Sequence, residues 1–189
     1  QVRVWSASAS DTNVSVKVDG LDANYVAITE TVVLNNGTTG VLTNANFLRV
    51  NSISLTRVPQ NVGIISAGNT GKTITLAMIG TTSNTSAGRS QMSVYTVPAG
   101  YTFFLTQSNW YTNQTGSGTA LYRSWTQNPT GLINTVLTFP LQQQYNSVKV
   151  VPRTYSEKMD IQWQVASSSG TSNIGGQIEG YLVSNTLIA

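Results

Sequence analysis

Apolar and polar residues alternate along much of the chain with the two-residue period of a β-strand. The clearest examples are the segments 13–18 and 159–166, where every second residue is apolar. The alternating residues are Val14, Val16 and Val18 in the first segment, and Met159, Ile161, Trp163 and Val165 in the second. This pattern predicts strands that bury one face and expose the other.

Further short apolar runs separated by Gly, Asn, Ser, Thr and Pro clusters predict additional strands. They cover residues 25–34, 47–56, 72–79, 91–97, 101–111, 120–126, 132–139, 145–151 and 177–183. No segment carries a sustained helical period. We therefore predict an all-β fold, an antiparallel β-sandwich of jelly-roll-like type or a barrel, with about ten to thirteen short strands and no substantial helix.

Two of these strands allow more specific predictions. In 47–56 the apolar parity changes between Val50 and Ile53, which predicts an interior bulge near Asn51-Ser52. In 72–79 the apolar residues Ile74, Leu76 and Met78 share one parity, and we expect that face to point into the core.

Turn residues predict two chain reversals. Asn36-Gly37 after the segment 25–34 is a strong hairpin signal. Pro98-Ala-Gly100 lies within the stretch 95–105, where Pro98 fixes φ and Gly100 permits a tight reversal. We expect a hairpin here, with Tyr101, Phe103 and Leu105 on the core face of its second strand.

The segment 80–90 consists almost entirely of small polar residues and resembles a linker. We favour a single β-sandwich over residues 1–189, in which 80–90 is a long loop. The alternative is a split at this segment into an N-terminal and a C-terminal β region.

Composition excludes several classes of protein. Only 9 % of the 189 residues are charged, and cysteine and histidine are both absent. Disulfides, thiolate metal sites and histidine-based catalysis are therefore excluded. The net charge is +3 and the ten basic residues are scattered, which argues against nucleic-acid binding. No apolar run approaches the roughly 20 residues of a membrane-spanning helix. Because Gln1 is not an initiator Met, we expect the sequence to begin partway into the gene product.

The acidic residues suggest two possible sites, each with a simpler explanation. Glu157 and Asp160 are three positions apart, with Arg153 and Lys158 close by. An ion pair with these basic residues in a loop is a simpler explanation than the opposed carboxylates of a glycosidase. Asp11, Asp19 and Asp22 match no calcium-loop spacing, and Asp is an ordinary turn residue. We predict no catalytic, cofactor-binding or metal-binding residues and no enzymatic activity.

Aromatic residues are concentrated on the two predicted strands 101–111 and 120–126. Trp110, Tyr111 and Tyr122 are the candidates for a contact with a glycan or a partner, because the apolar face of a sugar stacks on a flat ring. The same residues can instead form a cross-strand core cluster. Both interpretations remain open, with Trp110 and Tyr111 as the better glycan candidates.

Three blocks of sequence together resemble a known family. They are residues 18–25 (VDGLDANY) with 30–35 (ETVVLN), residues 95–100 (YTVPAG), and residues 156–161 (SEKMDI) with 178–183 (IEGYLV). Their order and spacing are similar to a family of tailed-bacteriophage virion structural proteins of the marine phage type. The family has no catalytic residues to transfer, and its members usually carry an additional N-terminal segment.

The resemblance implies a non-enzymatic virion structural protein, most simply a capsid decoration or cement protein that stabilises the particle. Its partners would be other virion proteins, major capsid or tail proteins, with no nucleic acid and no membrane. A homo-oligomer such as a trimer is expected, located in the virion after assembly in the host cytoplasm. The alternative is a tail or fibre module that binds host surface glycans.

Overall fold

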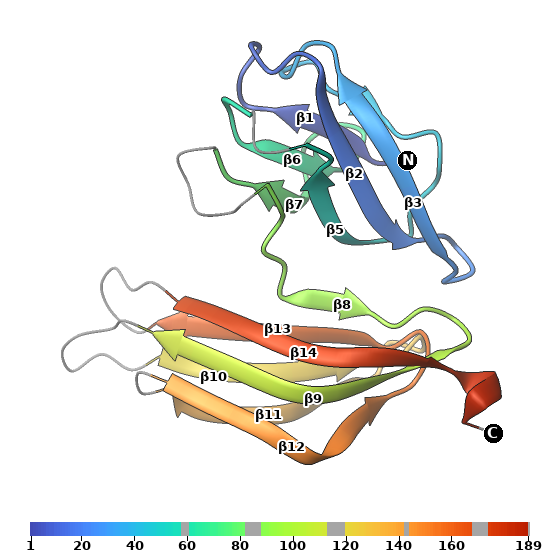
Figure 1. Ribbon diagram of the computed structural model, residues 1–189, viewed down its shortest axis with the longest axis vertical. Helices are drawn as coiled ribbons and strands as arrows, with labels where there is room; N and C mark the ends of the chain where they lie inside the picture. The colour runs from blue at the N-terminus through green and yellow to red at the C-terminus, as the bar shows by residue number, and fades with distance from the viewer. Residues whose placement is uncertain (58–60, 82–87, 113–119, 142–143, 168–173, 189) are drawn as a thin grey trace. The chain divides into compact units, whose positions relative to one another are not determined.

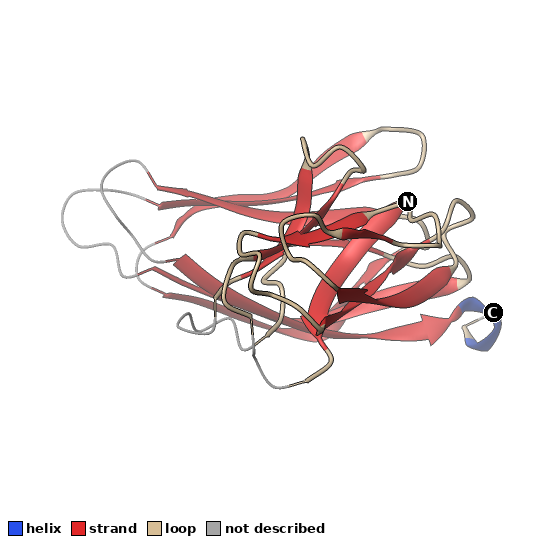
Figure 2. Ribbon diagram, turned by 90° about the horizontal axis from the view of Figure 1, so that it is seen from above, coloured by secondary structure: helices blue, strands red, loops and turns tan. Residues whose placement is uncertain are grey.

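The chain is all-β, as predicted. The computed structural model describes residues 1–57, 61–81, 88–112, 120–141, 144–167 and 174–188. These residues form fourteen strands and one 3₁₀ turn, η1 (Asn185–Leu187) (Figure 2). All recorded strand pairings are antiparallel. The strand number exceeds the expected range because short elements such as β4 (Val41–Leu42) are too brief to show an alternation.

The chain divides into two compact units, unit 1 (Gln1–Met92) and unit 2 (Ser93–Ala189). Each unit has its own cluster of buried apolar residues. The sequence favoured a single sandwich, with residues 80–90 as the alternative boundary; the division observed lies just beyond that segment. Alternation identifies the buried face of a strand, but it does not show which strands share a core.

Unit 1 contains two sheets (Figure 1). The first has the order β4-β1-β6-β7, formed with β1 (Arg3–Ser6), β6 (Ile65–Gly68) and β7 (Thr75–Ile79). The second has the order β3-β2-β5, formed by β3 (Ala27–Leu34), β2 (Val14–Leu21) and β5 (Arg49–Leu55). Both sheets contribute to one core, in which Val16, Val18, Val4 and Ile65 are fully buried. The predicted burial of the 13–18 alternation is thus confirmed.

The predicted bulge in β5 is also confirmed. Asp19 pairs with Ser52 and Gly20 pairs with Val50, so Asn51 is an extra residue in the strand. The extra residue reverses the parity, and both Val50 and Ile53 are therefore buried.

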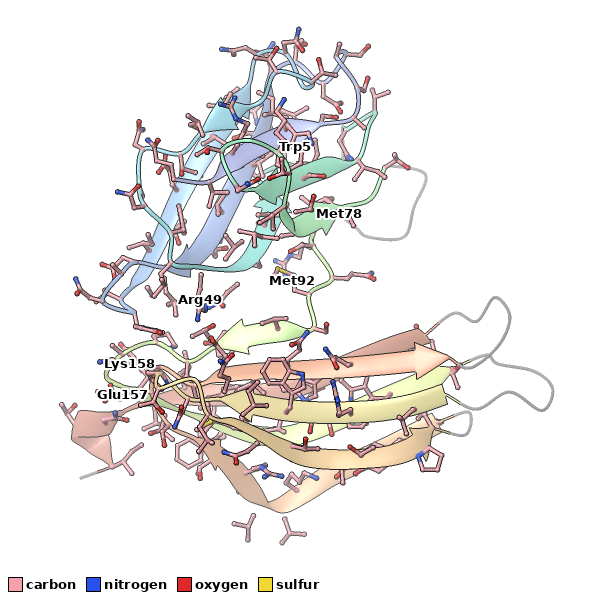
Figure 3. All side chains as sticks on the ribbon, turned by 180° about the vertical axis from the view of Figure 1, so that it is seen from behind. Trp5, Arg49, Met78, Met92, Glu157 and Lys158 are labelled. Carbon is pink, nitrogen blue, oxygen red and sulfur yellow. The ribbon has the colours of Figure 1, made fainter. Side chains whose placement is uncertain are left out.

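The prediction of which face of β7 points into the core is wrong. Ala77 and Ile79 are buried, whereas Ile74, Leu76 and Met78 are 58 %, 47 % and 56 % exposed. Strand β7 lies at the edge of its sheet, and Leu76 is an extra residue relative to β6. On the outer face Met78 pairs with Ser66, which pairs in turn with Trp5. Figure 3 labels the Trp5 and Met78 side chains.

The Asn36-Gly37 hairpin does not form. Strand β3 ends at Leu34, and the next strand, β4, pairs with β1 in the other sheet. The Asn36 side chain accepts hydrogen bonds from the Thr38 and Thr39 backbone amides. The segment therefore turns the chain from one sheet to the other.

Unit 2 also contains two sheets. One has the order β11-β10-β13-β8, formed by β11 (Ile133–Leu141), β10 (Ala120–Gln127), β13 (Asp160–Ser167) and β8 (Val94–Thr96). The other has the order β12-β9-β14, formed by β12 (Gln144–Tyr155), β9 (Tyr101–Thr112) and β14 (Ile174–Ser184). Residues of both sheets share one buried cluster, as in a β-sandwich. The finer jelly-roll assignment stays a prediction.

Burial in β13 agrees with the predicted alternation. Ile161 and Trp163 are 0 % and 2 % exposed, and Met159 packs against the same core. The prediction for the Val165 side chain falls outside the described residues.

The stretch 95–105 is a crossing between sheets and is not a hairpin. Strand β8 pairs with β13, whereas β9 pairs with β12 and β14. Gly100 has a φ of 78°, which permits the reversal. Phe103 and Leu105 are buried as expected, but Tyr101 is 42 % exposed. The predicted turn is therefore correct in place and wrong in the strands that it joins.

Candidate interaction surface

Two of the three candidate aromatic residues belong to the core of unit 2. Trp110 and Tyr122 are 8 % and 2 % exposed, and their ring centroids lie 5.1 Å apart at 51°. Tyr111 follows Trp110 on β9, points to the opposite face and is 57 % exposed. The structure therefore does not bring the three rings together, and Trp110 and Tyr122 are not accessible to a sugar.

Burial changes the acid strength of the aromatic core. It raises the pKa of the Tyr122 hydroxyl to about 12, and hydrogen bonding with Ser124 opposes the shift. Burial also raises the pKa values of Tyr95 and Tyr155, the latter against the opposing charge of Arg153. The core therefore favours the neutral, protonated form of these tyrosine hydroxyls.

We expect unit 2 to lose stability in alkaline solution. A folded-state pKa above the unfolded value of about 10 favours folding fully below pH 10. This contribution falls as the pH rises toward about 12 for Tyr122. Tyrosinate absorbance and circular dichroism over this range should show ionisation together with unfolding, and Tyr122→Phe should move the transition to higher pH. Free titration of Tyr122 near pH 10 in the folded protein would contradict this prediction.

The three aspartates considered above as a possible calcium loop have separate structural roles. Asp11 is 1 % exposed and accepts hydrogen bonds from the Ser6 hydroxyl and from the amides of Val62 and Gly63. Asp19 forms an ion pair with Lys17 at 2.9 Å. Asp22 accepts hydrogen bonds from two amides of its own turn. Within the described residues, no group of three or more His, Cys, Asp or Glu side chains could hold a metal ion.

Glu157 and Asp160, the other acidic residues considered above as a possible site, also stabilise local structure. The Glu157 carboxylate accepts a hydrogen bond from the Gly100 amide, and that of Asp160 accepts one from the Thr96 hydroxyl. The two carboxylates thus hold the start and the end of the Thr96–Gly100 crossing.

Val150 of β12 is the most exposed large apolar residue among the described residues of unit 2. Val148 pairs with Gln107 and Arg153 pairs with Leu105, so residues 149–152 protrude from the regular pairing with β9. Val148, Val150 and Val151 are 67 %, 100 % and 80 % exposed. We call residues 148–152 the valine bulge. Since water contact with apolar side chains is unfavourable, three neighbouring exposed valines indicate a contact surface.

Two basic side chains accompany the exposed valines, Lys149 within the valine bulge and Arg153 directly after it. The Lys149 ammonium group donates a hydrogen bond to Ser147, and the Arg153 guanidinium lies 5.7 Å from the Tyr155 ring centroid. Cation–π contact limits the movement of Arg153. The surface therefore combines exposed valines with two positive charges close in the sequence.

Most of the valine bulge, residues 148–151, lies in the segment 145–151, which the sequence predicts as an ordinary strand. The available signal was the loss of alternation at Val150-Val151 directly before Pro152. Consecutive β-branched residues followed by proline are typical of an irregular edge strand.

Comparisons with protein-family models, with curated proteins and with solved structures found no match. In the part of the chain that the structure describes, no helix has the length and apolar character needed to cross a membrane.

Proposed function

We propose that this protein is a non-enzymatic structural component of a tailed-bacteriophage particle, a decoration or cement protein of the capsid. The sequence resemblance and the low charge support the proposal. The observation that carries it is the valine bulge, an exposed apolar projection suited to a protein–protein contact. The protein would act in the virion, after assembly in the host cytoplasm.

The contact would draw its free energy from the valine side chains. Burying one valine contributes about 1.5 kcal/mol or more. Valine is also stiff at χ1, so little side-chain entropy is lost on binding. Lys149 and Arg153 favour an apolar depression with acidic residues at its rim. We therefore propose a surface of this chemistry on another virion protein, the major capsid protein in particular.

The alternative function is a tail or fibre module that binds host glycans. Its support is the exposed ring of Tyr111, because the other two candidate rings are buried. A glycan-binding signal lost on Tyr111→Ala would favour this alternative.

The decoration function is tested by changing the tip of the valine bulge. Val150→Asp combined with Val151→Asp would place two charges in the contact, and we expect particle occupancy to fall at least about tenfold, equivalent to 1.4 kcal/mol. Copies per particle are measured by quantitative mass spectrometry, and their location by electron microscopy.

Val33→Asp provides the control, since Val33 is a 46 % exposed valine on β3. This variant should occupy particles as the unchanged protein does. Undiminished occupancy of the double variant, or a few copies found only at the tail, would refute the decoration function.

A further inference from the structure

Strand β14 is a long and regular sheet edge. It spans 11 residues, and no described strand pairs with its outer edge (Figure 1). The irregularity in its pairing with β9 arises from Thr106, an extra residue in β9, so β14 itself has no extra residue. It contains no proline, lysine or arginine. Its outer backbone groups are therefore available to another strand.

Other edge strands have features that obstruct such pairing. Strand β12 has the valine bulge and Pro152, and β11 has Pro140 and the extra residue Val136. In unit 1, Glu30 of β3 binds the amides of Asn44 and Ala45, which places a loop beside that edge. These are common protections against unwanted strand addition. Within the described residues, β14 has none of these features, which indicates that this edge has a partner.

The faces of β14 follow from its register with β9. Gly176 and Gly180 pair with the buried residues Trp110 and Leu105, so they lie on the core face. Gln177, Glu179 and Tyr181 lie on the exposed outer face. Tyr181 is already ordered there, because its ring stacks on Phe104 with centroids 5.3 Å apart and planes at 6°.

We propose that β14 pairs antiparallel with β14 of a second copy of this chain, centred on Ile178. This register places Ile178 opposite Ile178 of the second copy and Gly176 opposite Gly180. On the outer face it places Gln177 opposite Glu179, and Gly175 opposite Tyr181. Every pair from 175 to 181 then joins compatible residues, which is the self-complementarity that a two-fold interface requires.

The chemistry of the facing pairs supports a second copy as the occupant. Glu179 is the single charged residue of β14, and this register opposes it to an amide donor instead of another carboxylate. Gln177 Nε2 already donates to Glu179 Oε1 within one chain at 2.8 Å, so the two groups are compatible. The interface would extend the sheet to β12-β9-β14-β14-β9-β12 and would give a dimer in place of the expected trimer.

Cysteine cross-linking tests the register directly, because the natural chain has no cysteine. In this register, residues 177 and 179 of the two copies are direct neighbours, about 4.5–5.5 Å apart, within disulfide range. Two copies of residue 177 are diagonal neighbours at about 7–8 Å, too far for a disulfide. We expect a mixture of Gln177→Cys and Glu179→Cys proteins to form a disulfide dimer and either protein alone to remain uncross-linked. Equal cross-linking in all three samples would overturn the register.

Sedimentation equilibrium tests the association itself. The unchanged purified chain should dimerise, and Gln177→Glu should weaken the dimer at least about tenfold because it opposes two carboxylates at each outer pair. Gln144→Glu makes the same change on β12, the other edge of this sheet, and should leave the dimer unchanged. A monomer at all concentrations, or equal effects of the two variants, would overturn the proposal. These measurements need no phage particle, so their outcome is independent of the proposed function.

Discussion

Replacing Asp11 with alanine should destabilise unit 1 by about 3–5 kcal/mol. The carboxylate is buried and accepts hydrogen bonds from the amides of Val62 and Gly63 at 2.6 and 2.9 Å, and from the Ser6 hydroxyl. Alanine would leave these donors without an acceptor and away from water. The loss would appear in urea denaturation and as faster hydrogen exchange at the Val62 and Gly63 amides.

Asp22→Ala is the matched control for this prediction. Asp22 also accepts two backbone amides, from Asn24 and Val26, but these bonds lie in an exposed turn. Water can replace its carboxylate there, and we expect a cost of only about 1 kcal/mol. If the two variants lost equal stability, burial would not be the reason for the importance of Asp11.

Replacing Gly20 with alanine should destabilise unit 1 by about 3 kcal/mol. A Cβ atom at residue 20 would lie 2.1 Å from the Arg49 carbonyl oxygen and 2.8 Å from the Phe47 ring. The carbonyl belongs to β5, two residues before the extra residue Asn51, where Arg49 pairs with Leu21. It can move away only if the β2–β5 pairing opens. Thermal or urea unfolding measures the loss.

Gly71→Ala separates the effect of close approach from that of glycine replacement in general. An added Cβ at residue 71 meets no atom within 4 Å. Alanine has less conformational freedom than glycine in the unfolded chain, so Gly71→Ala should leave the stability unchanged or raise it by about 0.5 kcal/mol. If Gly20→Ala changed stability as little as Gly71→Ala, the Arg49 carbonyl of β5 would be able to move away, which would contradict the prediction.

The features that the sequence predicted correctly depend on local alternation. Strand β2 and the Ile161–Trp163 part of β13 bury the residues that the two-residue period selected. The bulge at Asn51 was predictable because an extra residue reverses the parity of the apolar positions that follow it. Such patterns depend on neighbouring residues and require no knowledge of strand order.

The predictions from sequence were wrong where the structure depends on pairing between strands that are distant in the sequence. In β7, the extra residue Leu76 depends on the register with β6, which the sequence of β7 does not reveal. The Pro98–Gly100 turn suits a hairpin as well as a crossing between sheets. Its role depends on β13 taking β8 as a neighbour while β9 pairs with β12 and β14.

The candidate surface was less predictable than the fold. The aromatic residues were candidates because of their residue type alone. Their positions on alternate faces of β9 bury Trp110 and expose Tyr111. The valine bulge involves only common residues. It protrudes because four residues of β12, 149–152, lie opposite the single residue Thr106 of β9. Neither strand alone contains that information.

The position of β9 also affects the order in which the protein can fold during synthesis. Strand β9 is central in its sheet, yet Tyr101 pairs with Ser184, close to the last residues of the chain. All strands of unit 1 precede Met92, so its sheets can be complete while unit 2 is still being translated. Strand β9 must wait with one side unpaired until β14 leaves the ribosome, and such distant pairings form slowly. Translation thus gives the second unit a period of vulnerability to aggregation that the first does not share.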